Sequence, residues 1–325
     1  MRYYESETTA IRQFMQEHDN FLVTAHVSAD GDAYGAALGM AYLLKQLGKK
    51  ATVVLDDAVK DEKYRTLWGW DDILCYSPEM KMNFDAAIAV DVSSRKRIGD
   101  LAVLLPDSEH CVMIDHHPKE EDFADINLHD TAASSASRLV FELVMACNIE
   151  VTEDLAMVLL TGLVFDTGRF SFSNTGKRDF EIAARLIEAG ARPEKVSEFM
   201  MFNIPIRSLR TIGSGLTGLK LLLDDKIGLV FLPKELIEVD EELDIDPLAN
   251  YSLSPIGVEV GVFIRETSEL FKISLRSKGL INVSEIAQEI GGGGHRQAAG
   301  CRFVGTYADL EALLVRLVKK QLGDQ

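Results

Sequence analysis

The sequence predicts an α/β protein whose N-terminal part holds a mostly parallel sheet with helices on both faces. Short apolar runs rich in β-branched residues alternate with helical patterns in the first half, and this alternation is typical of parallel strands joined by helical crossovers. The 325 residues are 47% hydrophobic and 26% charged, which is enough for a large core and favours two domains.

Four buried strands are expected in the first half, in the runs "FLVTAH" (21–26), "KATVVLD" (50–56), "FDAAIAVDV" (84–92) and "HCVMID" (110–115). Between the first two, residues 33–48 have helical spacing and end in Gly48, a residue suited to the position after a last helical turn. Further helices are expected near 132–147, 153–165 and 177–189. The expected strands and helices locate the carboxyl end of each strand in the sequence.

The second half has a different pattern. Glycine and proline in "AGARPEK" (189–195) break the preceding helix, and residues 206–223 are interpreted as a connecting helix. Strand patterns follow at 227–233, 257–266 and 270–279. We therefore expect a first domain over residues 1–190, a linker with a connecting helix over 191–223, and a smaller α/β domain over 224–325.

Three features of the sequence indicate the cellular compartment of the protein. The N-terminal segment has acidic residues and no apolar core, which argues against a secretory signal, and the run "LAMVLLTGLVF" (155–165) is too short to span a bilayer. Four cysteines lie far apart without a C-x-x-C pair, which argues against a disulfide framework and a thiolate zinc site. We expect a cytoplasmic protein with no membrane partner.

The net charge of −17 also limits the partners. An acidic surface repels polyanions, so we do not expect binding to long duplex nucleic acid. A site for two divalent cations must concentrate carboxylates, which is a second source of acidity.

Acid and imidazole side chains follow three of the expected strands. His26, Asp30 and Asp32 lie in "HVSADGD" after the first strand, Asp91 closes the third, and "DHH" (115–117) closes the fourth. In open α/β sheets, ligands gather outside the carboxyl ends of the strands. We therefore expect these side chains to meet at one edge.

A further acid, Asp166 in "LVFDTGRF", ends the helix expected at 153–165, where Gly168 lets the chain turn. Taken singly, each acid is more often a cap or turn residue. Together, four carboxylates and two imidazoles require cations to neutralise them. Oxygen and nitrogen donors without sulfur favour manganese, with magnesium, cobalt and iron as substitutes. The predicted metal ligands are His26, Asp30, Asp32, Asp91, His116 and Asp166.

The series "HVSADGD", "AVDVS", "IDHHP" and "FDTGRF" resembles, in that order, the four motifs of the DHH phosphoesterases. This family includes RecJ-type exonucleases, manganese-dependent inorganic pyrophosphatases and NrnA-type oligoribonucleases. The resemblance implies two manganese ions per chain. It assigns His26 and Asp30 to one ion, Asp32, His116 and Asp166 to the other, and Asp91 to both.

The same resemblance gives roles to the remaining polar residues of "DHH". His117 faces the substrate phosphate, and Asp115 supports the histidines without binding metal, so both belong to the predicted catalytic set. Independently of the family, two divalent ions about 3.5–4 Å apart can activate a shared water and stabilise the phosphorus under attack. His117 is then available to stabilise the phosphate or to protonate the leaving oxygen.

A glycine-rich segment, "GGGGHRQAAG" (291–300), is expected as a loop between the helix at 282–291 and a further helix. Successive glycines expose backbone N–H groups to an anion, and nearby basic side chains favour phosphate binding. The segment resembles the DHH-associated C-terminal domain, in which this loop and an upstream "SLRS" (274–277) contact the nucleotide backbone. The predicted substrate-binding residues are Ser274, Arg276, Ser277, Gly292, Gly293, Gly294, His295 and Arg296.

The combination of both halves in 325 residues most resembles the NrnA group. This resemblance implies an enzyme of RNA degradation that cuts nanoRNA and linear dinucleotides such as pApA to mononucleotides, and that also dephosphorylates 3′-phosphoadenosine 5′-phosphate. Hydrolysis of cyclic dinucleotides is an alternative activity. A nucleotide-binding regulatory module without catalysis is an alternative of another class. A homodimer is the default expectation for the assembly.

Overall fold

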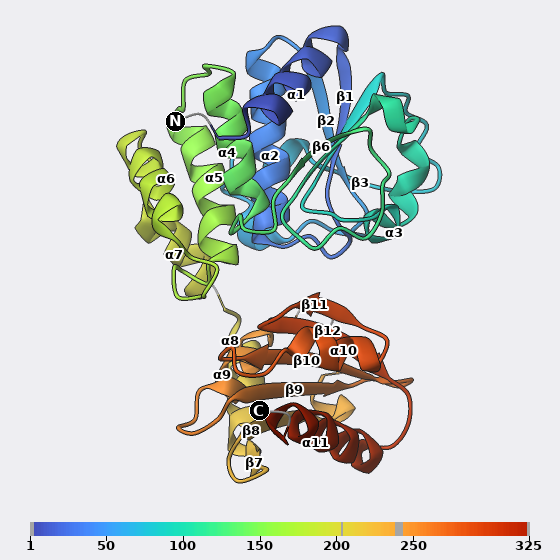
Figure 1. Ribbon diagram of the computed structural model, residues 1–325, viewed down its shortest axis with the longest axis vertical. Coiled ribbons are helices and arrows are strands. Elements are labelled where there is room, and N and C mark those ends of the chain that lie inside the picture. The colour runs from blue at the N-terminus through green and yellow to red at the C-terminus, as the bar shows by residue number, and fades with distance from the viewer. Residues whose placement is uncertain (1–2, 203, 238–242, 324–325) are drawn as a thin grey trace. The chain divides into compact units, whose positions relative to one another are not determined.

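Residues 3–202, 204–237 and 243–323 are described by the computed structural model (Figure 1). The chain divides into two units, residues 1–203 and 204–325. The division falls inside the segment 191–223 that the sequence predicts as a linker, while the expected limits at residues 190 and 224 stay predictions.

The first unit contains a six-stranded sheet in which every neighbouring pair is parallel. This arrangement confirms the predicted parallel sheet. Its strands, in spatial order, are β3 (Leu74–Cys75), β2 (Lys50–Leu55), β1 (Asn20–Thr24), β4 (Ala86–Val90), β5 (Cys111–Asp115) and β6 (Ile126–His129). The short strands β3 and β6 were not predicted, because neither has a long apolar run.

The strand order reverses between β1 and β4, which lie side by side although β2 and β3 come between them in the chain. Such a reversal opens a crevice at the carboxyl ends of the strands, and ligands bind there in doubly wound sheets. The segments that follow β1, β4 and β5 therefore start from one region of the sheet edge.

Helices cover both faces of this sheet. One large core joins most of them to the sheet, and a smaller core lies on the other face, where Figure 1 shows α3 across the sheet from α2 and α4. The helices are α1 (Glu5–Glu17), α2 (Gly31–Gln46), α3 (Arg95–Ile98), α4 (Ala136–Ala146), α5 (Glu153–Asp166), α6 (Lys177–Glu188) and α7 (Pro193–Met201).

The second unit contains a mixed six-stranded sheet, in which β8 and β9 pair in parallel and the other neighbours pair antiparallel. Its strands, in spatial order, are β11 (Gly293–His295), β12 (Ala298–Phe303), β10 (Phe271–Ser277), β9 (Val260–Glu266), β8 (Ile227–Leu232) and β7 (Lys220–Leu222). The helices of this unit are α8 (Ile206–Thr217), α9 (Pro247–Leu253), α10 (Val283–Glu289) and α11 (Tyr307–Gly323).

Two expectations for the second half were wrong. The connecting helix expected over 206–223 ends at Thr217, and β7 begins three residues later. The segment expected as a loop between two helices forms a hairpin of β11 and β12 instead, with α11 starting only at Tyr307. Pairing with neighbouring strands decides both segments, because their own residues favour strands only weakly.

Five short 3₁₀ helices complete the described structure, at Glu62–Tyr64, Trp70–Asp72, Gly99–Leu104, Ser108–His110 and Lys234–Leu236. Within the described ranges, the helices lack the combination of length and apolar character that a bilayer-spanning segment needs.

Candidate metal centre and phosphate-binding face

The start of α2 orients the first two acids of the site. Asp30 caps this helix, because its Oδ1 accepts hydrogen bonds from the backbone N–H groups of Asp32, at 2.9 Å, and Ala33, at 3.2 Å. Its other oxygen, Oδ2, lies 3.8 Å from Nε2 of His26. The His26 ring is oriented in turn by a hydrogen bond of 2.9 Å from Nδ1 to the carbonyl of Val27, so Nε2 faces the acids.

Asp32 is fully buried and is held by the N-terminus of α4. Its Oδ2 accepts a hydrogen bond of 2.6 Å from the N–H of Ala136, and its Oδ1 accepts one of 3.0 Å from the N–H of Ser137. Gly162 of α5 leaves room for this contact, since a β-carbon there would lie 2.5 Å from Asp32 Oδ1. The amides of α4 thus stabilise a buried carboxylate.

Asp91 lies at the centre of the cluster. It has a left-handed backbone, with φ of 54°, and its N–H donates to the carbonyl of Ile114 on the neighbouring strand, at 2.9 Å. Its Oδ2 is 3.4 Å from Nε2 of His26, and its Oδ1 is 3.3 Å from Nε2 of His116. A non-glycine residue with this φ has a strained backbone, and such residues cluster at functional sites.

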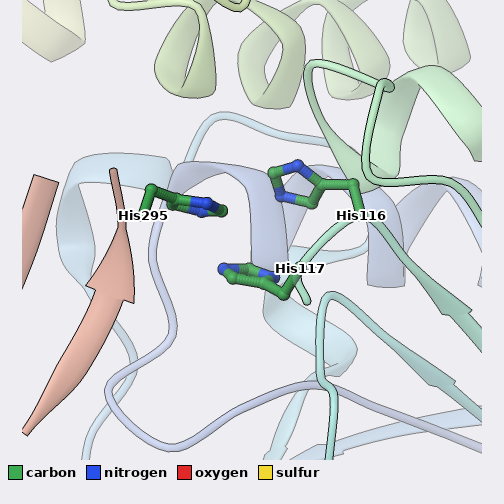
Figure 2. Close-up of side chains that lie close together, drawn as sticks. All are labelled: His116, His117 and His295. Carbon is green, nitrogen blue, oxygen red and sulfur yellow. The ribbon is translucent and has the colours of Figure 1, made fainter. Parts of the chain in front are cut away.

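The two histidines after β5 lie side by side, with ring centroids 4.5 Å apart (Figure 2). Nε2 of His116 lies 2.9 Å from Oδ2 of Asp166, the last residue of α5. His117 is oriented differently, because its Nδ1 hydrogen-bonds to Oδ1 of the fully buried Asp115 at 2.9 Å. The shortest carboxylate contact of each imidazole is with a different acid, although both rings also face Asp91 Oδ1, at 3.3 and 3.5 Å.

Two neighbours of this cluster were missed by the sequence analysis. Nε2–H of His129, on β6, donates to the carbonyl of His117 at 2.6 Å. The Asn174 amide donates to the carbonyl of Asp166 at 3.0 Å and to that of Ser134 at 3.1 Å. Two of these three bonds fix the backbone at the predicted site residues His117 and Asp166, and none of the three leaves a signal in the local sequence pattern.

The predicted metal ligands fall into overlapping groups that share Asp91. One ligand atom from each of His26, Asp30 and Asp91 lies within 4.8 Å of the other two, and the same holds for Asp32, Asp91 and His116. Asp166 joins the second group through its 2.9 Å approach to His116. The structure thus brings together all six residues that the sequence proposed as metal ligands.

Buried charges in this cluster shift one another's pKa values. Burial would lower the pKa of His26, but contact with the Asp91 carboxylate outweighs burial and raises that pKa to about 9. Burial raises the pKa of Asp30 to about 6, and the nearby Asp91 charge adds to the rise. Burial likewise raises the pKa of Asp32. For Asp91 itself, the imidazoles of His116 and His26 overcome burial and hold the pKa well below its ordinary range.

The donor set fits divalent cations. Asp91 Oδ1 is buried and, among the described residues, accepts no hydrogen bond, although it faces His116 and His117. A buried carboxylate oxygen of this kind requires a partner, and a cation supplies one. Carboxylate and imidazole donors without thiolate suit manganese or magnesium rather than a structural zinc site.

The second unit presents several of the predicted phosphate-binding residues on one face of its sheet. Arg276 of β10 pairs with Ala298 of β12, which pairs with His295 of β11, so these side chains form a row across three strands. Ser274 stands in the next row, beside two glycines. Alternation along β10 places Ser274 and Arg276 on the same face.

Helices cover the neighbouring part of this face. Ile212 of α8 and Leu248 of α9 pack on Val230 and Phe263, and the face beyond them carries Arg276. The Arg276 Nε–H donates to Oδ1 of Asn250 at 3.1 Å, and burial lowers the pKa of this guanidinium. Arg276 is therefore partly buried beside α9, and the other members of its row are His295 and the small Ala298.

Ser277 is not part of this face. Its side chain lies on the opposite face of β10 from Ser274 and Arg276, and the residue is only 5% exposed. Its hydroxyl donates to the carbonyl of Ile281 at 2.6 Å and accepts from the N–H of Gly279 at 3.0 Å. The structure thus gives Ser277 a role in closing the turn after β10, and its predicted contact with substrate stays a prediction.

The glycine segment is folded more tightly than a loop. A β-carbon at Gly292 would lie 2.1 Å from the carbonyl oxygen of Gly300, and one at Gly294 would lie 2.6 Å from that of Ala298. A β-carbon at Gly293 would meet no atom within 4 Å. Arg296 is exposed, and its Nη2 donates to the carbonyl of Gly279 at 3.5 Å. Two of the glycines are therefore required by the hairpin itself.

Comparison with known proteins finds two matching families, one in each half of the chain. Residues 20–163 match the DHH family, N-terminal domain, and residues 238–324 match the DHHA1 domain. The bifunctional oligoribonuclease and PAP phosphatase NrnA of Thermus thermophilus is 28% identical over 314 residues, which are 95% of this chain and 91% of that protein.

Two further likenesses add to this comparison. The cyclic-di-AMP phosphodiesterase GdpP of Bacillus subtilis is 28% identical over 316 residues, which cover 91% of this chain and 47% of GdpP. The crystal structure of an exopolyphosphatase-related protein from Bacteroides fragilis has a TM-score of 0.89 and 27% sequence identity, and the match covers 97% of this chain and 96% of that chain.

Proposed function

We propose that this chain, a member of the DHH family with a DHHA1 domain, is a metal-dependent phosphodiesterase that hydrolyses very short oligonucleotides and linear dinucleotides such as pApA to mononucleotides. The observation that carries the proposal is the position of Asp91, whose two carboxylate oxygens face His26 and His116 within 3.4 Å. One carboxylate facing two ligand groups is the arrangement that a pair of ions requires.

The ligand groups divide between two ions. His26 and Asp30 would hold one ion, Asp32, His116 and Asp166 would hold the other, and Asp91 lies among the groups of both sets. Manganese is the proposed native metal, at two ions per chain, and magnesium, cobalt or iron(II) are substitutes. When bound, such ions lower the pKa of water and polarise the phosphate, which is the chemistry of two-metal hydrolases.

His117 acts on the substrate rather than on the metal. Its Nδ1 is held by Asp115, and we assign its Nε2 to the phosphate or to the leaving oxygen. Asp115 is fully buried and orients this imidazole. Because His129 also fixes the backbone of His117, the ring has a defined direction.

The second unit binds the nucleotide backbone. The row formed by Arg276 and His295, with Ser274 beside it, supplies side-chain donors for phosphate oxygens. A few donors of this kind suit a short substrate. The NrnA relative supports this substrate class, and its PAP phosphatase activity supports a companion phosphatase activity on 3′-phosphoadenosine 5′-phosphate.

The test is a substrate panel with the purified protein and manganese. It contains pApA, 5′-phosphorylated oligomers of increasing length, cyclic di-AMP and 3′-phosphoadenosine 5′-phosphate, with products separated by chromatography. We expect the fastest turnover on the dinucleotide and a fall with length. Rapid cutting of long oligomers would contradict the proposal.

Hydrolysis of cyclic dinucleotides is the second candidate, because the match to GdpP covers 91% of this chain. The panel separates the two activities, since a cyclic dinucleotide phosphodiesterase consumes cyclic di-AMP faster than pApA. A regulatory module would bind nucleotide without turnover of any substrate. The complete set of six ligand groups argues against that class, because nucleotide binding alone does not need them.

A further inference from the structure

The chain makes an unusual turn directly after the metal-site residue Asp166. Gly168, Arg169 and Phe170 have φ values of 54°, 62° and 62°, so three successive residues are left-handed. Arginine and phenylalanine rarely adopt this conformation, because the β-carbon crowds the following carbonyl. Strain of this kind persists only where the surroundings hold it, and it is concentrated at functional sites.

Thr167 holds the turn from within. Its buried hydroxyl donates to the carbonyl of Leu163 at 2.6 Å and accepts from the N–H of Phe170 at 3.1 Å. Its carbonyl accepts from the N–H groups of Ser171 and Phe172, both at 3.0 Å. Four hydrogen bonds to one residue therefore fix the segment that carries both phenylalanines.

The two phenylalanines of the turn have different surroundings. Phe170 packs against the core and stacks on Phe180, with ring centroids 5.1 Å apart and an interplanar angle of 28°. Phe172 is 44% exposed. Its ring lies against Gly168, since a β-carbon at Gly168 would come within 2.6 Å of three ring atoms. Phe172 is thus fixed from below and open to solvent.

We propose that the exposed ring of Phe172 is the surface on which a base of the substrate stacks while its phosphate is at the metal centre. The proposal rests on the proposed function and names the group that recognises the nucleoside part. The Phe172 ring lies against Gly168, which follows the metal-site residue Asp166 by two positions in the chain. Every base has an aromatic face, so stacking binds short oligonucleotides without sequence preference.

The test compares substrates with and without a base. The wild type and Phe172→Ala are assayed on pApA and on analogues in which either the 5′ or the 3′ nucleoside lacks its base. We expect Phe172→Ala to lower kcat/KM on pApA by about 10- to 100-fold, the range that base stacking gives. On the analogue that lacks the stacked base, the variant and the wild type should be equal.

Matched variants keep the result interpretable. Phe172→Trp should retain turnover of pApA and should show fluorescence quenching by the dinucleotide, while Phe172→Leu, which keeps the bulk, should lose turnover as Phe172→Ala does. Phe180→Ala removes another exposed phenylalanine of the same unit and should leave the ratio between pApA and the abasic analogues unchanged. Circular dichroism and manganese content check that each variant is folded and loaded.

Two outcomes overturn the inference in different ways. If Phe172→Ala lowers turnover of pApA and of both abasic analogues equally, or of none, Phe172 does not stack on a base, and the proposed function stands. If the wild type hydrolyses no dinucleotide at all, the proposed function fails and the inference fails with it.

Discussion

The two units present groups for phosphate chemistry in opposite ways. In the first unit, the side chains are mostly buried and contact one another. The single carboxylate of Asp91, for example, contacts imidazoles from two other segments of the chain. In the second unit, Arg276 and His295 stand on a partly open sheet face among glycine and alanine. A buried cluster with more carboxylates than imidazoles binds cations, whereas a partly exposed basic row can bind an anion directly.

This difference predicts different responses to mutation. Removing one group from the buried cluster leaves its neighbours with unpaired charge, so the effect spreads through the site. Removing one donor from the basic row breaks only that donor's own contacts, such as the hydrogen bond from Arg276 to Asn250. A substitution at one residue of the metal centre should therefore impair the whole centre. A substitution in the basic row should remove only the contribution of the residue that is replaced.

The largest effect is expected for Asp91→Asn, which keeps the shape of the side chain and removes the charge that two groups share. Manganese should fall below two ions per chain, and dinucleotide turnover should fall by more than the roughly 100-fold that loss of a supporting hydrogen bond to a ligand causes. Elemental analysis and kinetics measure both. Asp85→Asn, at the opposite end of β4, is the matched control and should keep both. Two ions and wild-type turnover in Asp91→Asn would show that this carboxylate is not shared.

Much of the first site could be predicted from the sequence, because its residues follow long apolar runs. The runs at 84–92 and 110–115 are strands β4 and β5, and the acids and histidines after them meet as expected. The support of Asp32 could not be predicted. It comes from the N–H of Ala136, 104 residues away, and only the packing of α2 against α4 brings the two together.

The second site was predicted less well, because its residues depend on strand pairing. The run "AAGCRF" (298–303) is rich in small residues that disfavour strands, yet it lies between β10 and β11 and becomes β12. Once that hairpin exists, the face of each residue follows from alternation. The run "SLRS" predicts that Ser277 acts together with Ser274, whereas alternation along β10 puts the two side chains on opposite faces.

The next effect concerns pH. Metal binds only deprotonated ligands, and in the metal-free protein the pKa of His26 is about 9 and that of Asp30 about 6. Manganese affinity should therefore rise from pH 6 to pH 9, by up to about tenfold per pH unit for each proton released. Titration calorimetry at several pH values measures this rise. An affinity that does not change with pH would contradict it.

The stability of the metal-free protein should change in the opposite direction. The pKa of His26 is raised above its ordinary value of 6.5, so its stabilising contact with Asp91 is fully present below pH 6.5 and is lost as the pH rises through about 9. The free energy of unfolding should fall across this window by up to about 3 kcal/mol. Denaturant unfolding in EDTA measures the change, and His26→Gln should remove most of it.

A smaller and more selective effect is expected in the basic row. His295→Ala and Arg276→Ala should keep two manganese ions per chain and lose about 10- to 100-fold in dinucleotide hydrolysis, as expected for one charge-assisted hydrogen bond. Hydrolysis of bis-p-nitrophenyl phosphate, which lacks a nucleotide backbone, should persist. Lys272→Ala, on the same face of β10, is the control for loss of charge alone. Equal losses on both substrates would give the row a direct role in the chemistry.

The smallest effect on turnover is expected for Ser277→Ala. The hydroxyl of Ser277 makes two hydrogen bonds inside the turn after β10, so its loss should lower the free energy of unfolding by about 1–3 kcal/mol while dinucleotide turnover stays nearly unchanged. Ser274→Ala should show the reverse, because its side chain is on the face of Arg276. Denaturant unfolding and kcat/KM on pApA give the pair of values for each variant. A stable Ser277→Ala with impaired turnover would mean that both serines contact the substrate, and the division of β10 into a binding face and a packing face would then be wrong.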